Sequence, residues 1–183
     1  MSAGAQQCRA ALVTGAASGI GRAVAERLTD DGMDVLSVDL KPDPDGPGIP
    51  FEADLTNAEA NEASVNAALE RFGRLDVIVA NAGIQHVSPI EDFPTERWNA
   101  IVSLLLTSPF LLAKYSWPAL KESGAGRFIA IASVHGLVAS PYKAAYISAK
   151  HGVVGLVKTL ALEGAGAQLE ARLLAGEEAR NDS

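Results

Sequence analysis

Two residues in the last third of the chain, Tyr146 and Lys150, have the types and spacing for acid–base chemistry. They stand four residues apart in a segment whose pattern predicts a helix, so both side chains lie on one helix face. A phenol, with a pKa of about 10, is a poor base at neutral pH, but an adjacent ammonium stabilises its phenolate form. Tyr146 is therefore a candidate general acid or base. The alternative is a plain pair of neighbours on a helix surface.

Ser133 adds a hydroxyl to this pair. It precedes Tyr146 by 13 residues and directly follows the apolar run 127–132, which predicts a strand. A hydroxyl at a strand end can hold the carbonyl or alcohol oxygen of a substrate. No metal is implied, because the three histidines show no ligand spacing with each other or with a cysteine: His86, His135 and His151.

Short apolar runs alternate with helical patterns along the chain, which is typical of a parallel sheet covered by helices. The expected strands are 11–14, 35–38, 51–54, 75–80 and 127–132, and the expected helices are 19–30, 58–72, 95–120 and 142–164. Four prolines make 41–50 a loop. We therefore expect an α/β fold, a doubly wound Rossmann-type parallel sheet of five strands with helices on both faces. The 95–120 helix is apolar nearly all round, which predicts a subunit interface.

A glycine-rich turn connects the first expected strand to the first helix, and its candidate binding residues are Gly15, Ser18, Gly19, Ile20 and Gly21. Glycines let backbone N–H groups approach a pyrophosphate, which the positive helix end favours. Such a turn can also be only a turn, but here the next strand ends on an acid. Asp39 lies 24 residues after Gly15, where a carboxylate binds ribose hydroxyls and repels a 2′-phosphate. The pattern favours NAD over NADP. Arg22 is a mild counter-signal that we assign to a surface or helix-capping role.

The spacing of Thr14, Gly15, Gly19 and Gly21, with the serine, tyrosine and lysine downstream, resembles the short-chain dehydrogenase family over about residues 10–163. The resemblance implies that Tyr146 takes the alcohol proton while hydride passes to nicotinamide, and that Lys150 also binds the nicotinamide ribose. It further implies a set of adenosine contacts, made by Asp54, the backbone of Leu55, and the turn Asn81, Ala82 and Gly83.

Two segments, 82–94 and 131–143, resemble the 3-hydroxybutyrate dehydrogenases within that family. This resemblance implies that Gln85, His135 and Lys143 hold a substrate carboxylate. The chemistry agrees, because Lys143 and a protonated His135 supply charge and Gln85 supplies an amide donor. Taken singly, His135 can be a hydrogen-bonded loop residue and Lys143 a solvated one. Together they predict a small anionic substrate. The resemblance implies that this substrate is 3-hydroxybutyrate, oxidised to acetoacetate with NAD.

The chain departs from the family pattern in two places. Leu105 stands where the family has an asparagine that holds a water between the lysine and solvent, and leucine cannot hydrogen-bond that water. Ser108, one turn later, is a partial substitute. From residue 165 the resemblance stops, and 165–183 predicts a helical or frayed tail without the family's last strands and lid. We expect a Rossmann domain over 10–164 between an N-terminal tail (1–9) and this divergent tail, and activity impaired because water enters the site.

Bulk properties narrow the partners. A net charge of −7 disfavours nucleic acid, and the single cysteine, Cys8, fits a reducing compartment. The longest apolar segment, 101–112, is shorter than the roughly 20 residues that span a bilayer. We therefore expect a cytoplasmic chain without a membrane partner. Full-length members of the resembled family are tetramers built through the helices matching 95–120 and 142–164, so a homo-oligomer is expected.

Two alternatives remain open at this point. The first is a short-chain dehydrogenase that acts on another alcohol or ketone, such as a steroid, with Gln85, His135 and Lys143 incidental. The second is a non-catalytic, truncated relative that binds nucleotide or pairs with a full-length partner subunit. Leu105 and the divergent tail favour this second alternative.

Overall fold

The computed structural model describes residues 8–175. Its strands form one parallel sheet in the order β3-β2-β1-β4-β5-β6, with bounds β1 (Ala10–Thr14), β2 (Asp34–Asp39), β3 (Ile49–Glu52), β4 (Val77–Ala80), β5 (Arg127–Ala132) and β6 (Glu170–Ala175). β1 pairs with β2 on one side and with β4 on the other, so the strand order reverses between β1 and β4. In open α/β sheets, ligands bind beyond the carboxyl ends of the strands at this reversal.

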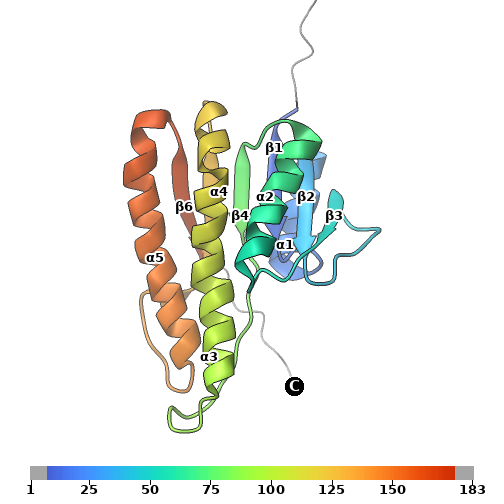
Figure 1. Cartoon of the computed structure of the whole chain (residues 1–183). Helices are drawn as coiled ribbons and strands as arrows, with labels where there is room; N and C mark the ends of the chain where they lie inside the picture. Colours follow the sequence, from blue (N-terminus) through green and yellow to red (C-terminus); the bar gives the residue numbers. More distant parts are fainter. Residues whose placement is uncertain (1–7, 176–183) are drawn as a thin grey trace, which may run out of the picture.

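Helices cover both faces of the sheet, as predicted. α1 (Gly19–Asp30) lies behind the sheet in Figure 1, whereas α2 (Ala58–Phe72), α4 (Ser108–Glu122) and α5 (Ala144–Gly164) lie on its front face. The core is split in the same way because strand side chains alternate between faces. Leu12, Ile78 and Phe128 belong to the large cluster under α2, α4 and α5, and Val13 and Val79 belong to the smaller one under α1. The predicted fold class is confirmed.

The predicted bounds of α1, α2 and β5 match the structure. The others shift by a few residues. β3 begins at Ile49 and includes Pro50, which a strand at the sheet edge tolerates. α5 begins at Ala144 instead of Tyr142, because Tyr142 has φ +68, in the left-handed region that a helix excludes. Lys143 therefore sits at the helix cap.

β6 corrects two of our predictions, the five-strand sheet and the domain end at residue 164. All six residues of β6 pair in parallel register with β5. Ala171 and Leu173 pack against the core under α5, whereas Arg172 and Leu174 are exposed. The predicted helical or frayed tail is therefore wrong for 170–175, and the part of that tail at 176–183 lies outside the described residues.

The expected 95–120 helix is divided into α3 (Thr95–Val102), a π-helical turn η1 (Ser103–Thr107) and α4. The continuous segment Thr95–Glu122 has 28 residues and contains an 18-residue window with a mean hydropathy of 1.3, enough by length and composition alone to cross a membrane. It is longer than the apolar run 101–112 on which we excluded a span. Its α4 portion packs on α2, β4 and β5, a place in the fold that accounts for its apolar character.

Candidate active site

The predicted catalytic residues gather beyond the carboxyl end of β5. Ser133 follows β5 directly and is buried, and its Oγ accepts a hydrogen bond of 3.1 Å from the His135 N–H. Tyr146 lies in the first turn of α5, packed against Ile101, Leu105 and the rest of a small apolar cluster. The structure therefore brings a strand-end hydroxyl and a helix-borne phenol to the same edge of the sheet.

Lys150 is the buried cation of this group, with 6% of its surface exposed. Its Nζ lies 5.6 Å from the centroid of the Tyr146 ring and donates a hydrogen bond of 2.6 Å to the Ile131 carbonyl. Burial lowers the pKa of Lys150 to about 8, which leaves the ammonium form dominant at neutral pH. A charge this close to the phenol is what the predicted acid–base role requires.

Two of the three residues predicted to bind the substrate carboxylate are in contact with each other. Lys143 Nζ lies 3.5 Å from His135 Nε2, and the His135 ring meets the Tyr146 ring edge-on at 6.1 Å between centroids. This contact brings the amino group of Lys143, a hydrogen-bond donor, to the edge of the His135 ring. Lys143 therefore supplies a cation beside Tyr146, and a protonated His135 stays a prediction.

The second ring nitrogen of His135, Nδ1, differs in its surroundings from Nε2. Nδ1 is buried and has no hydrogen-bond partner among the described residues. A buried polar atom without a hydrogen-bond partner costs free energy, on the order of 1–3 kcal/mol, unless a ligand supplies that partner. The corner therefore combines a cation and a buried ring nitrogen that has no partner among the described residues, both beside Tyr146.

Gln85, the third predicted ligand, is exposed in the segment after β4. This segment is tied to the loop that carries Lys143, because the Ser88 N–H donates a 2.9 Å hydrogen bond to the Tyr142 carbonyl. Tyr142 makes this contact in its left-handed conformation. The backbone thus joins the two predicted substrate loops, and direct contact of the Gln85 side chain with a carboxylate stays a prediction.

The glycine-rich turn has the shape of an anion cradle. A Cβ on Gly21 would overlap the Gly15 carbonyl oxygen, and a Cβ on Gly15 would lie 2.7 Å from Asn81 Nδ2. Ser18 caps α1 without a side-chain hydrogen bond, and Ser18, Gly19 and Ile20 are exposed. The N-terminus of α1 thus remains open, and its backbone N–H groups and positive dipole end suit a pyrophosphate.

Thr14 and Asn81 lock this turn to the end of β4, across the reversal in strand order. The Thr14 hydroxyl accepts hydrogen bonds from the N–H groups of Asn81 (2.9 Å) and Ala82 (3.0 Å). In return, Asn81 Nδ2 donates to the carbonyls of Thr14 (2.9 Å) and Gly15 (3.3 Å). The Asn81 amide therefore positions the turn, a use that our assignment beside the adenine ribose did not include.

Asp39, at the end of β2, reaches the same turn. One of its carboxylate oxygens accepts the Ala17 N–H at 3.1 Å, and the other accepts the Lys41 N–H at 3.1 Å. Each oxygen retains a second lone pair, so the carboxylate can still accept hydrogen bonds from two ribose hydroxyls. The structure places it beside the predicted phosphate cradle, as the ribose role requires.

The predicted adenine pair lies in the turn after β3. Asp54 is exposed and accepts hydrogen bonds from the backbone and hydroxyl of Thr56, whereas Leu55 is buried. The sequence analysis missed a residue that holds this turn. Asn61, fully buried in α2, donates to the Leu55 carbonyl at 3.0 Å. The signal was available, since a polar residue on the apolar face of a helix needs a buried partner.

Asn61 also accepts the hydrogen bond of the Ser108 hydroxyl. The Ser108 hydroxyl is buried and donates to Asn61 Oδ1 at 2.6 Å. Our suggestion that Ser108 partly replaces the missing asparagine is therefore wrong, because its proton is committed to α2. Leu105 itself is buried inside the π-helical turn, and a Cβ on Gly83 would lie 3.1 Å from its Cδ2.

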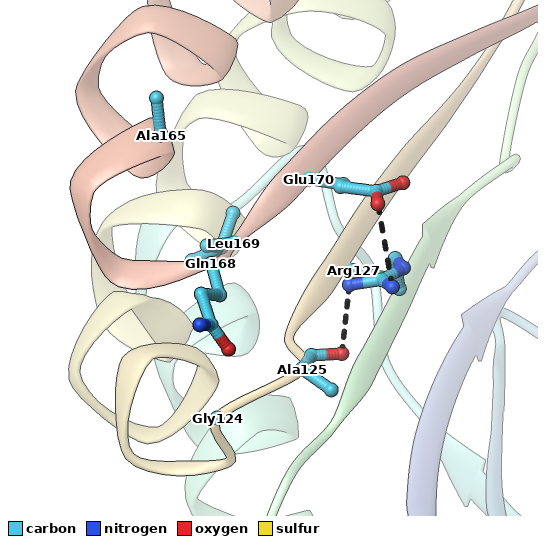
Figure 2. Close-up of a pocket in the computed structure, with 7 residues that line it drawn as sticks. All are labelled: Gly124, Ala125, Arg127, Ala165, Gln168, Leu169 and Glu170. Atoms are coloured by element: carbon cyan, nitrogen blue, oxygen red, sulfur yellow. Dashed lines mark hydrogen bonds and ion pairs between the residues drawn. The ribbon is translucent and has the colours of Figure 1, made fainter.

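A hollow of about 430 Å³ lies elsewhere, at the amino ends of β5 and β6 (Figure 2), lined by Gly124, Ala125, Arg127, Ala165, Gln168, Leu169 and Glu170. Arg127 donates to the Ala125 carbonyl at 3.0 Å and pairs with Glu170 at 3.4 Å. β5 separates this hollow from Ser133, which follows the strand's opposite end. Within residues 8–175, no three His, Cys, Asp or Glu side chains group to hold a metal.

Comparison with known proteins assigns the class. A model of the short chain dehydrogenase family matches residues 9–175, and this chain belongs to that family. The match includes β6, so it extends beyond the residue 163 that we predicted.

Individual relatives agree. The chain is 45% identical over 168 residues to the uncharacterized oxidoreductase YxjF of Bacillus subtilis, covering 85% of this chain and 65% of that protein. It is 44% identical over 167 residues to D-beta-hydroxybutyrate dehydrogenase of Cupriavidus necator, covering 85% and 64%. The chain thus spans under two thirds of these relatives' length. A solved structure of carveol dehydrogenase from Mycobacterium avium in complex with NAD matches with a TM-score of 0.83 at 28% identity, covering 91% of this chain and 69% of that one.

Proposed function

We propose that this short-chain dehydrogenase oxidises 3-hydroxybutyrate to acetoacetate with NAD. The observation that carries the proposal is the contact between Lys143 and His135 beside Tyr146, which offers a cation and a buried ring nitrogen without a partner among the described residues. A carboxylate suits the cation, and it accepts a hydrogen bond from a His135 ring nitrogen that carries a proton. The relative from Cupriavidus necator, a D-beta-hydroxybutyrate dehydrogenase, supports the same substrate.

In the proposed reaction, the Ser133 hydroxyl holds the substrate oxygen and the Tyr146 phenolate takes the hydroxyl proton. The ammonium of Lys150 stabilises that phenolate before the proton arrives. NAD, when bound, would accept the hydride that leaves the carbon bearing the hydroxyl group. The alcohol thus loses H⁻ and H⁺ and becomes a ketone. The reverse reaction returns both.

The choice of NAD is supported by the chain's own residues. Asp39 presents a carboxylate beside the phosphate cradle, where it repels a 2′-phosphate and accepts from ribose hydroxyls. The proposal also includes a cytoplasmic homo-oligomer assembled through α4 and α5. Apolar side chains exposed on these helices, Phe110 at 48% and Leu162 at 82%, support such an interface.

The test measures the reduction of NAD⁺ through the absorbance of the NADH formed. The substrates compared are 3-hydroxybutyrate, its methyl ester, 2-butanol and a panel of cyclic alcohols. Preference for the free acid over its ester supports the proposal. Equal rates on acid and ester favour another alcohol substrate. NAD⁺ binding without turnover on any substrate favours the non-catalytic relative.

Replacing Lys143 by methionine is expected to raise the KM for 3-hydroxybutyrate by about 10- to 100-fold, since the carboxylate loses a charge-assisted hydrogen bond. Turnover at saturation and the KM for 2-butanol should change little. Lys158→Met, at an exposed position in α5, is the matched control. An unchanged KM for the acid in the Lys143 variant would show that Lys143 does not bind the carboxylate.

Replacing Leu105 by asparagine is expected to raise turnover by about tenfold, because an amide restores a site for a relay water. This is less than the roughly 100-fold that a group transferring the proton directly contributes at least. Leu105→Ala opens the same space without an amide and should not raise turnover. Steady-state rates are compared at one temperature, at which urea-unfolding curves show that both variants are folded in the absence of urea. Equal rates in the asparagine variant and the parent protein would mean that the relay does not limit turnover.

A further inference from the structure

An ion pair between Arg22 and Asp43, close to Asp39 in the chain, has no part in the chemistry described so far. Arg22, in the first turn of α1, places Nη1 2.7 Å from Asp43 Oδ2 and Nε 3.0 Å from Glu26 Oε1. Asp43 comes from the loop after β2, four residues beyond Asp39. Arg22, assigned above to a surface or capping role, is thus held between two carboxylates.

The pair spans the junction at which the adenosine end of a dinucleotide would bind. Arg22 belongs to the helix whose N-terminus forms the phosphate cradle, and its N–H donates to the Ser18 carbonyl. Asp43 belongs to the segment that Asp39 starts, and the Ala17 N–H bond to Asp39 joins the two segments at 3.1 Å. A cation released at this junction would stand near the ribose.

Asp43 is held in place for this contact. Its second oxygen accepts the Asp45 N–H at 3.0 Å, which fixes the carboxylate toward Arg22. The hydrogen bond from Arg22, followed by that from Asp45, holds the pKa of Asp43 below its usual range, so it is ionised at neutral pH.

We propose that Asp43 is a determinant of cofactor specificity, because by occupying Arg22 it denies a guanidinium to the 2′-phosphate of NADP. A phosphate with about two negative charges is the ligand that a free guanidinium binds best, in a bidentate manner. Asp39 then repels the 2′-phosphate, while Asp43 keeps Arg22, the arginine in the first turn of α1, from pairing with that phosphate. This inference rests on the proposed use of a dinucleotide by this chain.

The experiment compares two fragments, 5′-AMP and adenosine 2′,5′-bisphosphate, together with NAD⁺ and NADP⁺, by isothermal titration calorimetry. The fragments differ only in the 2′-phosphate and need no catalytic step. Asp43→Asn should tighten the bisphosphate about tenfold, the effect of one charge-assisted contact, and leave 5′-AMP within about twofold. NADP⁺ should follow the bisphosphate.

Two variants separate release of Arg22 from a general loss of negative charge. Asp45→Asn removes the same charge two residues away, at an exposed position, and should change the ratio of the two affinities far less. The double variant Asp43→Asn/Arg22→Gln should lose the gain. Equal effects of Asp43→Asn and Asp45→Asn, or a gain that survives without Arg22, would overturn the inference.

The outcome for the parent protein distinguishes this inference from the proposed function. Failure of the parent protein to bind 5′-AMP or NAD⁺ overturns the proposed cofactor and this inference with it. Binding of 5′-AMP with an unchanged affinity ratio in Asp43→Asn overturns this inference alone.

Discussion

Replacing Tyr146 by phenylalanine is expected to lower the turnover of 3-hydroxybutyrate oxidation by about 100- to 10,000-fold, the range that a positioned proton-transfer group contributes. The variant removes one oxygen and keeps the ring. That ring packs beside Ile101, Leu105 and Ala149, so the fold should not change. The loss should be one of kcat, because Tyr146 acts on the proton that leaves in the transition state.

The controls follow from the contacts of the phenol. Lys150 keeps its hydrogen bond to the Ile131 carbonyl in the variant, so the nicotinamide half of the site retains its cation. NAD⁺ affinity and the urea midpoint should therefore match those of the parent protein. Ser133→Ala should also lose turnover, because the substrate oxygen loses a donor. Turnover retained in Tyr146→Phe would require another base and would refute the proposed mechanism.

The sequence predicted the parts of the fold that local signals determine. α1 and α2 carry strong helical periodicity, and β5 is a short buried run between two helices, so their bounds match. β6 was missed because Glu, Ala, Arg and Leu favour helices, and its strand state depends on pairing with β5. Ala171 and Leu173 do alternate with Arg172 and Leu174, but over so few residues the alternation is weak evidence.

Tertiary contacts explain the other differences. The strand expected over 75–80 begins at Val77, because the Asp76 carboxylate turns to the start of β1 and accepts the Ala10 N–H. The π-helical turn at 103–107 has no counterpart in the periodicity of the sequence. In the site, residue types gave the chemistry, whereas the pairing of Lys143 with His135 and of Ser108 with Asn61 depends on side chains from distant elements.

Replacing Asp76 by alanine is expected to lower the free energy of unfolding by about 2–4 kcal/mol, because the loss of this buried carboxylate leaves a cation and a backbone N–H donor unpaired. Asp76 is 1% exposed, accepts the Ala10 N–H at 2.8 Å and pairs with Arg74 at 2.6 Å. It thus ties the start of β1 to the start of β4. Asp76→Asn keeps an acceptor for Ala10 and should lose about half as much. Urea unfolding at pH 7 measures all three proteins.

The pH dependence gives this prediction a second, independent check. Burial disfavours the charged form, but the hydrogen bonds from Arg74 and Ala10 outweigh it and lower the pKa of Asp76. A carboxyl whose pKa is lower folded than unfolded stabilises the protein above the unfolded pKa, about 4, and loses this contribution as the pH falls through the folded pKa. The gap between the parent protein and Asp76→Asn should therefore shrink below about pH 4. A gap that is constant from pH 7 to pH 3 would show that the charge of Asp76 does not stabilise this end of the sheet, which lies opposite the end that carries the proposed chemistry.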